Sequence, residues 1–233
     1  MDLNKLAEAL VPDENVKPLE YYEKLYPERD LPKGAEVTRL APSPTGFMHL
    51  GNLYVAIANE RVAHQSGGVF YLRIEDTDEK RKVEGAVEVI HSSLKYFGIT
   101  FDEGADLTGD YGPYYQRQRA EIYHAYARDL IRRGLAYPCF CTEEELEKTR
   151  EHQTENKLLP GYYGEFAKCR NLAEKEIYDN LAAGKPYVIR LKSQGDVNIK
   201  HEFRDAVKGE ITVTENNQDV VILKSDGIPT YHF

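Results

Sequence analysis

The stretch at residues 41–52, APSPTGFMHLGN, places a histidine and a glycine where a strand is expected to give way to a helix. In open parallel sheets ligands bind at the carboxyl ends of strands, and the unpaired N–H groups at a helix N-terminus suit a phosphate. His49 could donate a hydrogen bond to phosphate oxygens, and Gly51 would let an adenine or ribose approach the backbone. A connecting loop with a surface histidine fits the same residues, and spacing alone leaves both interpretations open.

A second candidate is the acidic stretch LRIEDTD at residues 72–78. Glu75 ends an apolar strand and is predicted to lie at the same sheet edge as the histidine, where its carboxylate could bind an ammonium group. We assign structural roles to the acids that follow: Asp76 or Thr77 would cap the next helix, and Asp78 would lie on the surface.

A third candidate is the Cys-x-Cys pair Cys139 and Cys141, which Cys169 follows further along the chain. Such a pair can place two thiolates on one metal ion, and Zn²⁺ takes four ligands in structural sites. The candidates for the fourth ligand are His152, Tyr162, Tyr163 and water. Three semi-buried thiols without a metal are the alternative interpretation.

The fourth candidate is SDGIPTYHF at residues 225–233, where Asp226–Gly227 is a turn signal after a strand. Tyr231 is predicted to return to the sheet edge of the first two stretches. An ordinary tyrosine beyond a hairpin turn is the alternative.

Strands and helices alternate around the first two stretches, which predicts a parallel α/β sheet. The expected elements are a strand at 36–42, a helix at 51–66, a strand at 69–75, a helix from Val83 to Phe97 and a helix at 117–133.

The pattern changes after Gly134, and the residues that follow are typical of a small α+β insert. Thr142 and Glu145 have the spacing of a capping box before a charged helix. The other elements expected are a helix near 172–181 and strands at 187–191, 210–215 and 220–224. We expect the last strand to return to the first sheet. A short helix is expected near Asn4–Leu10, in a segment lying over the body of the protein.

Composition narrows the class of protein. The chain has 233 residues, 41% of them hydrophobic, which suffices for one sizeable domain or two small ones. It has no secretory signal and no apolar run near the ~18 residues of a membrane span. Three cysteines do not make a disulfide framework, so we expect a cytoplasmic protein without membrane association. The net charge of −9 disfavours nucleic-acid binding by charge alone.

The motifs together resemble one family. RLAPSPTGFMHLGN resembles the first signature of class I aminoacyl-tRNA synthetases in the glutamyl form, and YLRIEDTD resembles that family's next block. YYQRQR, YPCFCT and SDGIPTYHF follow in the family's order. The resemblance implies a Rossmann-like catalytic core, a parallel sheet with flanking helices, interrupted by a small α+β insert.

The resemblance also implies a division of the chain. Residues 1–35 are an extension, 36–134 the first half of the catalytic domain, 135–217 an insert that binds the acceptor stem, and 218–233 a return to the catalytic domain.

The resemblance assigns roles to individual residues. His49 would be catalytic. The residues expected against ATP are Thr45, Gly46, His49, Gly51 and Asn52. The residues expected to bind glutamate are Arg39, Ala41, Ser43, Glu75 and Tyr231. The metal ligands would be Cys139, Cys141 and Cys169. Asn52 stands where the family's signature often has a second histidine, and Asn171 stands where a histidine often completes the metal site.

The implied reaction joins glutamate to tRNA(Glu) through a glutamyl-adenylate, with ATP and Mg²⁺ and with Zn²⁺ as a further candidate. We expect a monomer. The family's lysine-bearing loop and anticodon-binding region have no counterpart in these 233 residues, so we expect the isolated chain to be an inactive fragment. The alternatives are a glutamyl-queuosine tRNA(Asp) synthetase and a non-catalytic nucleotide- or tRNA-binding module. A glutaminyl enzyme is disfavoured by Ser43.

Overall fold

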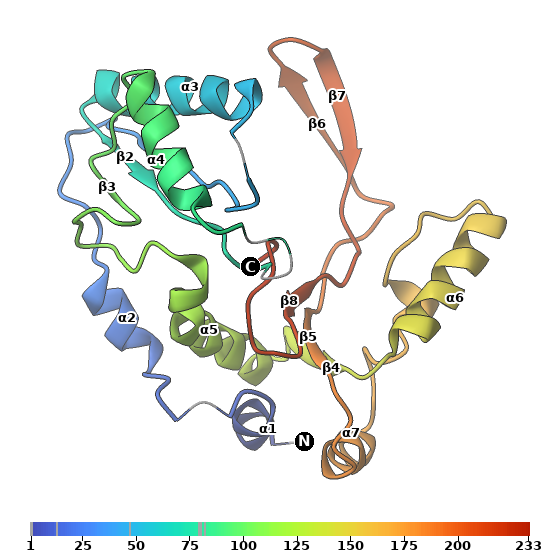
Figure 1. Cartoon of the computed structure of the whole chain (residues 1–233). Coiled ribbons are helices and arrows are strands. Elements are labelled where there is room, and N and C mark those ends of the chain that lie inside the picture. Colours follow the sequence, from blue (N-terminus) through green and yellow to red (C-terminus); the bar gives the residue numbers. More distant parts are fainter. Residues whose placement is uncertain (1, 13, 47, 79–80, 82) are drawn as a thin grey trace. The chain divides into compact units, whose positions relative to one another are not determined.

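The structure is a computed structural model that describes residues 2–12, 14–46, 48–78, 81 and 83–233 (Figure 1). The chain forms two compact units. The first unit comprises residues 1–14 and 123–233, and the second comprises residues 15–122. We describe each unit by itself.

The second unit contains a three-stranded parallel sheet in the order β1-β2-β3; the parallel sheet and its first two strands are predicted from the sequence, whereas β3 is not. Its strands are β1 (Val37–Leu40), β2 (Val69–Leu72) and β3 (Glu103–Gly104), and its helices are α2 (Leu19–Leu25), α3 (Leu50–Ser66) and α4 (Ala86–Tyr96). Val37 pairs with Val69 and Leu40 with Leu72, so β1 and β2 end side by side.

Hydrophobic packing holds this sheet against helices α3 and α4. Phe70, Leu72 and Ile74 are fully buried and share one hydrophobic cluster with residues of α3 and α4. The α3 residues in this cluster are the small Ala56 and Ala63, which let the helix approach the sheet closely. The predicted helices are confirmed, although α4 begins after the expected residue 83.

The first unit contains a three-stranded antiparallel sheet in the order β4-β5-β8, and a separate hairpin of β6 and β7 (Figure 1). The strands are β4 (Ala136–Cys139), β5 (Val188–Leu191), β6 (Lys200–Asp205), β7 (Gly209–Thr214) and β8 (Val221–Leu223). The α-helices are α1 (Leu3–Leu10), α6 (Glu143–Glu155) and α7 (Glu174–Ala182). The 3₁₀ helix η3 (Gly164–Phe166) also lies in this unit, and the 3₁₀ helix η2 (Gln116–Arg119) lies in the second unit. Helix α5 (Ala120–Arg132) begins at the end of the second unit and continues into the first.

One expectation about the strands is wrong, and one strand of this sheet was not predicted. The strand near 220–224 forms, but it pairs with β5 and does not join the first sheet. An apolar strand fits any buried position, and Ile222 and Leu223 here share a core with Ile189 of β5. Strand β4 is the strand that was not predicted. It contains Pro138, which cannot donate to a ladder, and it lies at the edge of its sheet, where a proline is tolerated.

Helix α1 is an integral part of its unit's core. Leu6 and Leu10 are buried in the hydrophobic cluster that contains the apolar residues of β5 and β8. Arg128 donates two hydrogen bonds to the carbonyl of Val11, at 3.0 and 2.7 Å, and Tyr187 donates one to Leu10 at 2.8 Å. The carbonyls at the end of α1 are therefore satisfied by side chains of the unit.

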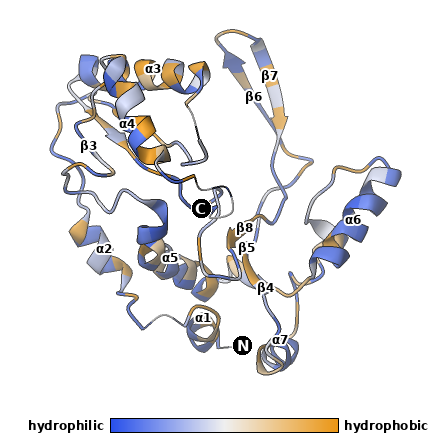
Figure 2. Cartoon of the chain, viewed as in Figure 1, coloured by the Kyte–Doolittle hydropathy of each residue, from blue (hydrophilic) through white to orange (hydrophobic). Residues whose placement is uncertain are grey.

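Helix α6 is a polar surface helix. Figure 2 shows α6 coloured mostly as hydrophilic, whereas β5 and β8 are hydrophobic. Thr142 and Glu145 form the predicted capping box of α6, with bonds of 3.2 and 2.9 Å. Among the described residues, no helix combines the length and the apolar character that crossing a bilayer requires.

Candidate functional site

The loop after β1 is anchored at alternate residues. Pro42 and Pro44 are buried, and their carbonyls accept hydrogen bonds from the amides of Glu75, at 3.0 Å, and Val83, at 2.9 Å. Ser43 and Thr45 lie between these anchors with exposed side chains. The predicted ligand-binding hydroxyls are thus presented to solvent by a fixed backbone. Phe47 lies outside the described residues.

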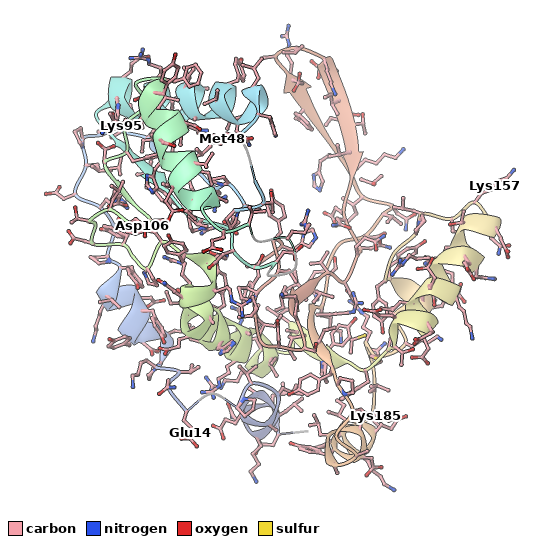
Figure 3. All side chains as sticks on the ribbon, viewed as in Figure 1. Glu14, Met48, Lys95, Asp106, Lys157 and Lys185 are labelled. Atoms are coloured by element: carbon pink, nitrogen blue, oxygen red, sulfur yellow. The ribbon has the colours of Figure 1, made fainter. Side chains whose placement is uncertain are left out.

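Gly46 and Met48 lead the chain from this loop into α3. Gly46 has a φ of 137°, a value that side chains other than glycine rarely adopt. Met48, labelled in Figure 3, packs against the hydrophobic cluster of the unit. The glycine therefore has a backbone reason, besides its predicted contact with ATP.

His49 is the N-cap of α3. Its Nδ1 accepts the N–H of Gly51 at 3.1 Å, and its own N–H donates to Oδ1 of Asn52 at 3.2 Å. An Nδ1 that accepts carries no proton, so the neutral imidazole keeps its proton on Nε2. The cap therefore leaves Nε2–H and the Asn52 amide nitrogen as donors, the two groups predicted to bind ATP.

Gly51 has a second reason to be glycine. A Cβ built at this position would lie 3.0 Å from the ring of His49, closer than nearly all real contacts of a Cβ atom. A side chain here would require the ring of the capping histidine to shift by a few tenths of an ångström. The structure thus adds an intramolecular reason to the predicted approach of adenine or ribose.

Arg39 and Glu75 meet at the ends of β1 and β2. Nη1 of Arg39 lies 3.8 Å from Oε1 of Glu75. Arg73 donates two hydrogen bonds to the same oxygen, from Nε at 2.9 Å and from Nη2 at 2.7 Å. The side chain of Glu75 is only 13% exposed, whereas that of Arg39 is 36% exposed. The pair predicted to bind glutamate is brought together, with Arg73 holding the carboxylate.

Asp76 has a structural role, but not the one expected. It is buried, and its Oδ1 accepts the N–H of Arg117, in η2, at 2.9 Å. The N-cap of α4 is instead Gly85, which makes no side-chain cap bond. The prediction that Asp76 or Thr77 caps the next helix is therefore wrong. Asp78 forms an exposed ion pair with Arg81 at 2.6 Å, as expected of a surface residue.

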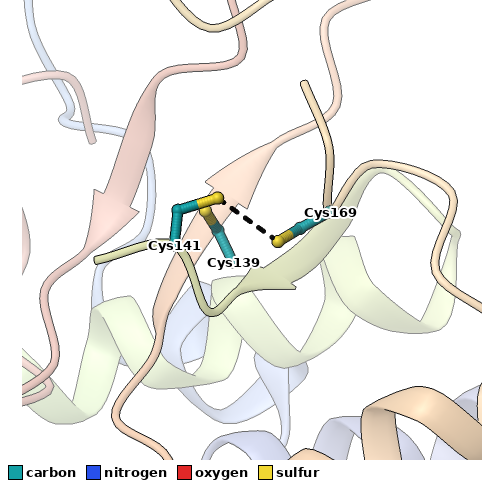
Figure 4. A group of neighbouring side chains, drawn as sticks. All are labelled: Cys139, Cys141 and Cys169. Atoms are coloured by element: carbon teal, nitrogen blue, oxygen red, sulfur yellow. Dashed lines mark hydrogen bonds between the residues drawn. The ribbon is translucent and has the colours of Figure 1, made fainter. Parts of the chain in front are cut away.

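The three cysteines form one cluster in the first unit (Figure 4). Their Sγ atoms all lie within 4.8 Å of one another, and those of Cys141 and Cys169 are 3.6 Å apart. Four ligands at Zn–S distances near 2.3 Å stand about 3.8 Å apart in a tetrahedron. The spacing of these atoms fits a common metal ion.

Tyr162 completes the surroundings of the cluster. Its buried hydroxyl lies 3.4 Å from Sγ of Cys139 and 3.3 Å from Sγ of Cys141, and it accepts the N–H of Cys169 at 2.9 Å. Of the other candidates for a fourth protein ligand, Tyr163 donates to the Leu159 carbonyl at 2.8 Å, and His152 is exposed, with its Nδ1 3.4 Å from the side-chain nitrogen of Asn156.

Interactions within the cluster make the pKa values of the Cys139 and Cys141 thiols differ. Hydrogen bonds from Cys141 and Cys169 lower the pKa of the Cys139 thiol. The pKa of Cys141 is raised by Cys139 and Cys169 beside it, and burial raises the pKa of the Tyr162 hydroxyl. One thiolate is thus favoured at Cys139, and a cation would have to stabilise the others.

Asp219 is a buried charge that the sequence analysis did not single out. Its carboxylate accepts hydrogen bonds from Tyr137 Oη at 2.5 Å, from the N–H of Ser193 at 2.8 Å and from Arg170. Its N–H donates to the carbonyl of Tyr162 at 2.8 Å. Asp219 therefore fixes the backbone that presents Tyr162 to the cysteines. An acid in a polar loop gives no periodic signal.

Tyr231 lies in the first unit, with 87% of its surface exposed. Its predicted role beside the glutamate-binding residues stays a prediction. The Asp226–Gly227 turn is confirmed: the N–H of Gly227 donates to Lys224 at 3.0 Å, and Gly227 has a φ of 77°.

Residues 36–233 match the family model of class I tRNA synthetases (E and Q), catalytic domain. This match covers most of the chain, so the chain belongs to that family, and the predicted Rossmann-like α/β fold is confirmed.

Individual proteins similar to this chain also belong to this family. The chain is 56% identical over 218 residues to the glutamate–tRNA ligase of Clostridium beijerinckii, which covers 92% of this chain. It is 55% identical over 237 residues to that of Acetivibrio thermocellus, which covers 100% of it. A crystal structure of a glutamate tRNA ligase from Elizabethkingia meningosepticum, in complex with its amino acid, matches 84% of the chain and 40% of that ligase, with a TM-score of 0.74 and 37% identity. The chain spans 39% and 43% of the length of the two curated relatives.

Proposed function

We propose that this chain supplies the glutamate- and ATP-binding part of a glutamate–tRNA ligase. The observation that carries the proposal is the meeting of Arg39 and Glu75 at the strand ends, in a chain of this family. Arg39 would bind the side-chain carboxylate of glutamate through two hydrogen bonds, and Glu75 with Ser43 would bind the α-ammonium group.

In the proposed reaction, the α-carboxylate of glutamate attacks the α-phosphorus of ATP. A new P–O bond forms, the bond to the β-phosphate oxygen breaks, and pyrophosphate leaves. The 2′-hydroxyl of the terminal adenosine of tRNA(Glu) then takes the glutamyl group and releases AMP. Mg²⁺ would neutralise phosphate charge. His49, with its proton held on Nε2 by the capping bond, would donate to a phosphate oxygen as negative charge develops.

We also propose that Cys139, Cys141, Cys169 and Tyr162 hold one Zn²⁺ ion. The separations of their Sγ and Oη atoms support this ligand set. The ion would act as a structural cross-link between β4 and the segment around residue 169, within the insert that we propose binds the tRNA acceptor stem. Elemental analysis of protein purified without chelator tests the site, since a zinc content near zero contradicts it.

The reaction can be tested with a chimera. This chain would replace the matched 43% of the Acetivibrio thermocellus ligase, with which it shares 55% identity. We expect glutamate-dependent exchange of pyrophosphate into ATP that tRNA(Glu) supports and tRNA(Asp) does not. In the His49→Ala chimera we expect this exchange to be about 10²-fold slower. His201→Ala, at an exposed histidine of the β6–β7 hairpin, is the matched control. Glutamylation of tRNA(Asp) would favour the glutamyl-queuosine paralogue. Calorimetry that detects ATP binding without any exchange in the chimera would favour the non-catalytic module.

A further inference from the structure

The segment after α2 contacts one loop of the second unit at several points. Tyr26 Oη donates to the carbonyl of Gly112 at 2.5 Å, and Tyr111 Oη donates to the carbonyl of Pro27 at 2.9 Å. Residues 26–29, called the strap below, lie before Glu36, where the family's catalytic-domain match begins. The strap is therefore tied to the catalytic unit although the family match does not include it.

Among the strap residues, Arg29 makes the strongest contacts with this loop. Its guanidinium donates two hydrogen bonds to the carboxylate of Glu103 in β3, and its Cζ lies 3.7 Å from the centre of the Tyr111 ring. The Arg29 and Glu103 side chains are 18% and 9% exposed, so the pair is largely removed from water. Removing one partner from such a pair is costly because the other charge stays buried.

The loop held by the strap, residues 103–117, is hydrogen-bonded to the segment that follows β2, where we propose that glutamate binds. The N–H of Ile74 donates to the carbonyl of Tyr114 at 2.9 Å, and the N–H of Gln116 donates back to Ile74 at 2.9 Å. The N–H of Arg117 donates to Asp76 at 2.9 Å. Both neighbours of Glu75 are thus fixed by residues 114–117.

Other contacts also support this loop: Tyr114 is buried in the hydrophobic cluster of the unit, and Tyr115 Oη donates to Asp106 at 2.8 Å. Arg119 donates to the carbonyls of Tyr111, at 3.2 Å, and Pro113, at 2.9 Å, from the side of η2. The strap holds the same segment through Tyr26 and through the ring of Tyr111. Loss of the strap's bonds would therefore loosen the ladder that fixes Glu75.

We propose that Arg29 and Tyr26 are positioning residues for glutamate binding, acting through the 103–117 loop on the orientation of Glu75. The proposal rests on the proposed function, because it assigns the amino group of glutamate to Glu75. It extends the site to a segment that precedes the family's catalytic domain. We expect the larger effect on the amino-acid side, because the ladder from residues 114–117 ends on the two neighbours of Glu75, whereas the cap at His49 is made by Gly51 and Asn52.

The test compares Arg29→Lys and Tyr26→Phe with the control Glu28→Gln, at an exposed position of the strap. Lysine keeps the charge but cannot form the two-bond pair, and phenylalanine removes one oxygen only. NMR of the 233-residue chain would follow amide exchange at Ile74 and Gln116, and titrations with L-glutamate and with ATP. We expect exchange at both amides to quicken about tenfold, and the Kd for glutamate to rise by a similar factor, with the Kd for ATP unchanged.

Four outcomes separate the possibilities. Unchanged amide exchange in both variants overturns the proposal, whatever the ligands do. Faster exchange with unchanged glutamate affinity also overturns it, because the strap would then brace the loop without positioning the site. Equal weakening of glutamate and ATP overturns it in favour of general destabilisation. If the unmutated chain binds no glutamate, the proposed function fails, while faster exchange still supports the link from strap to Glu75. Should Arg29→Lys not fold, Tyr26→Phe carries the same comparison.

Discussion

Replacing Asp219 by alanine or asparagine tests whether one buried carboxylate organises the first unit. The side chain of Asp219 has no exposed surface, and it accepts hydrogen bonds from Tyr137, Ser193 and Arg170. Alanine would leave the guanidinium of Arg170 without its carboxylate partner, and that group is only 23% exposed.

The size of the effect follows from these partners. Breaking a buried ion pair by removing one partner costs about 3–5 kcal/mol, and we expect Asp219→Ala to lose that much unfolding free energy. Asparagine keeps an acceptor oxygen but loses the charge. Hydrogen bonds to charged groups contribute about 1.5–3 kcal/mol, so Asp219→Asn should lose about half as much as alanine.

Urea unfolding followed by tyrosine fluorescence measures both variants, since the chain has 17 tyrosines and no tryptophan. Asp226→Asn is the control, because Asp226 is exposed and its acceptor role to Ile228 survives in an amide. Hydrogen exchange at the Ser193 amide should quicken in the Asp219 variants and not in the control. A loss below about 1 kcal/mol in Asp219→Ala would refute the reasoning, because a carboxylate with these partners cannot be that dispensable if the network holds the unit together.

Three further predictions concern single residues. Gly68→Ala should lose about 3 kcal/mol or more in thermal unfolding, because its Cβ would lie 1.9 Å from the carbonyl oxygen of Glu36, and a loss within 0.5 kcal/mol would contradict the packing described. Tyr162→Phe should weaken zinc affinity at least about tenfold in chelator competition, whereas Tyr163→Phe should not; equal affinities would show that the phenol is no ligand. The pKa of Glu215 is lowered by the backbone hydrogen bond from residue 196 and by a neighbouring histidine. Glu215 therefore stabilises the folded chain at pH values above its ordinary pKa of 4.5, and this stabilisation is lost as the pH falls through the lower pKa of the folded state. NMR titration of the carboxylate checks the sign: a pKa above 4.5 would reverse it.

The elements that the sequence predicts well are those defined by local signals. Helix α3 has its histidine cap, its apolar spacing and Gly67 in the left-handed conformation at its end, all within one stretch of chain. The capping box of α6 is equally local. Such signals need no knowledge of the tertiary structure, so the boundaries of these two helices are close to those expected.

The features that could not be predicted depend on residues far apart in the chain. The sequence of strand β8 is compatible with either sheet. The apolar residues that pack against it determine which sheet it joins. Asp219 gains its importance from donors 26, 49 and 82 positions away. Tyr162 and Tyr163 are adjacent tyrosines, and only the fold directs the first to the cysteines.

The charges at the strand ends bear on the choice of substrate in a family that includes glutamate and glutamine enzymes. Arg39, Arg73 and Glu75 together carry one net positive charge, and glutamate carries one net negative charge. Under the proposed function, glutamate would therefore neutralise the site, with its side-chain carboxylate on Arg39. Glutamine would leave this guanidinium facing an amide, which forms weaker hydrogen bonds than a carboxylate. A site that loses charge-assisted hydrogen bonds to the wrong substrate discriminates better than one that differs only in size. Arg39 is 36% exposed, and the neighbouring Glu75 is already held by Arg73; under the proposed function, the Arg39 guanidinium would therefore be the group that selects glutamate over glutamine.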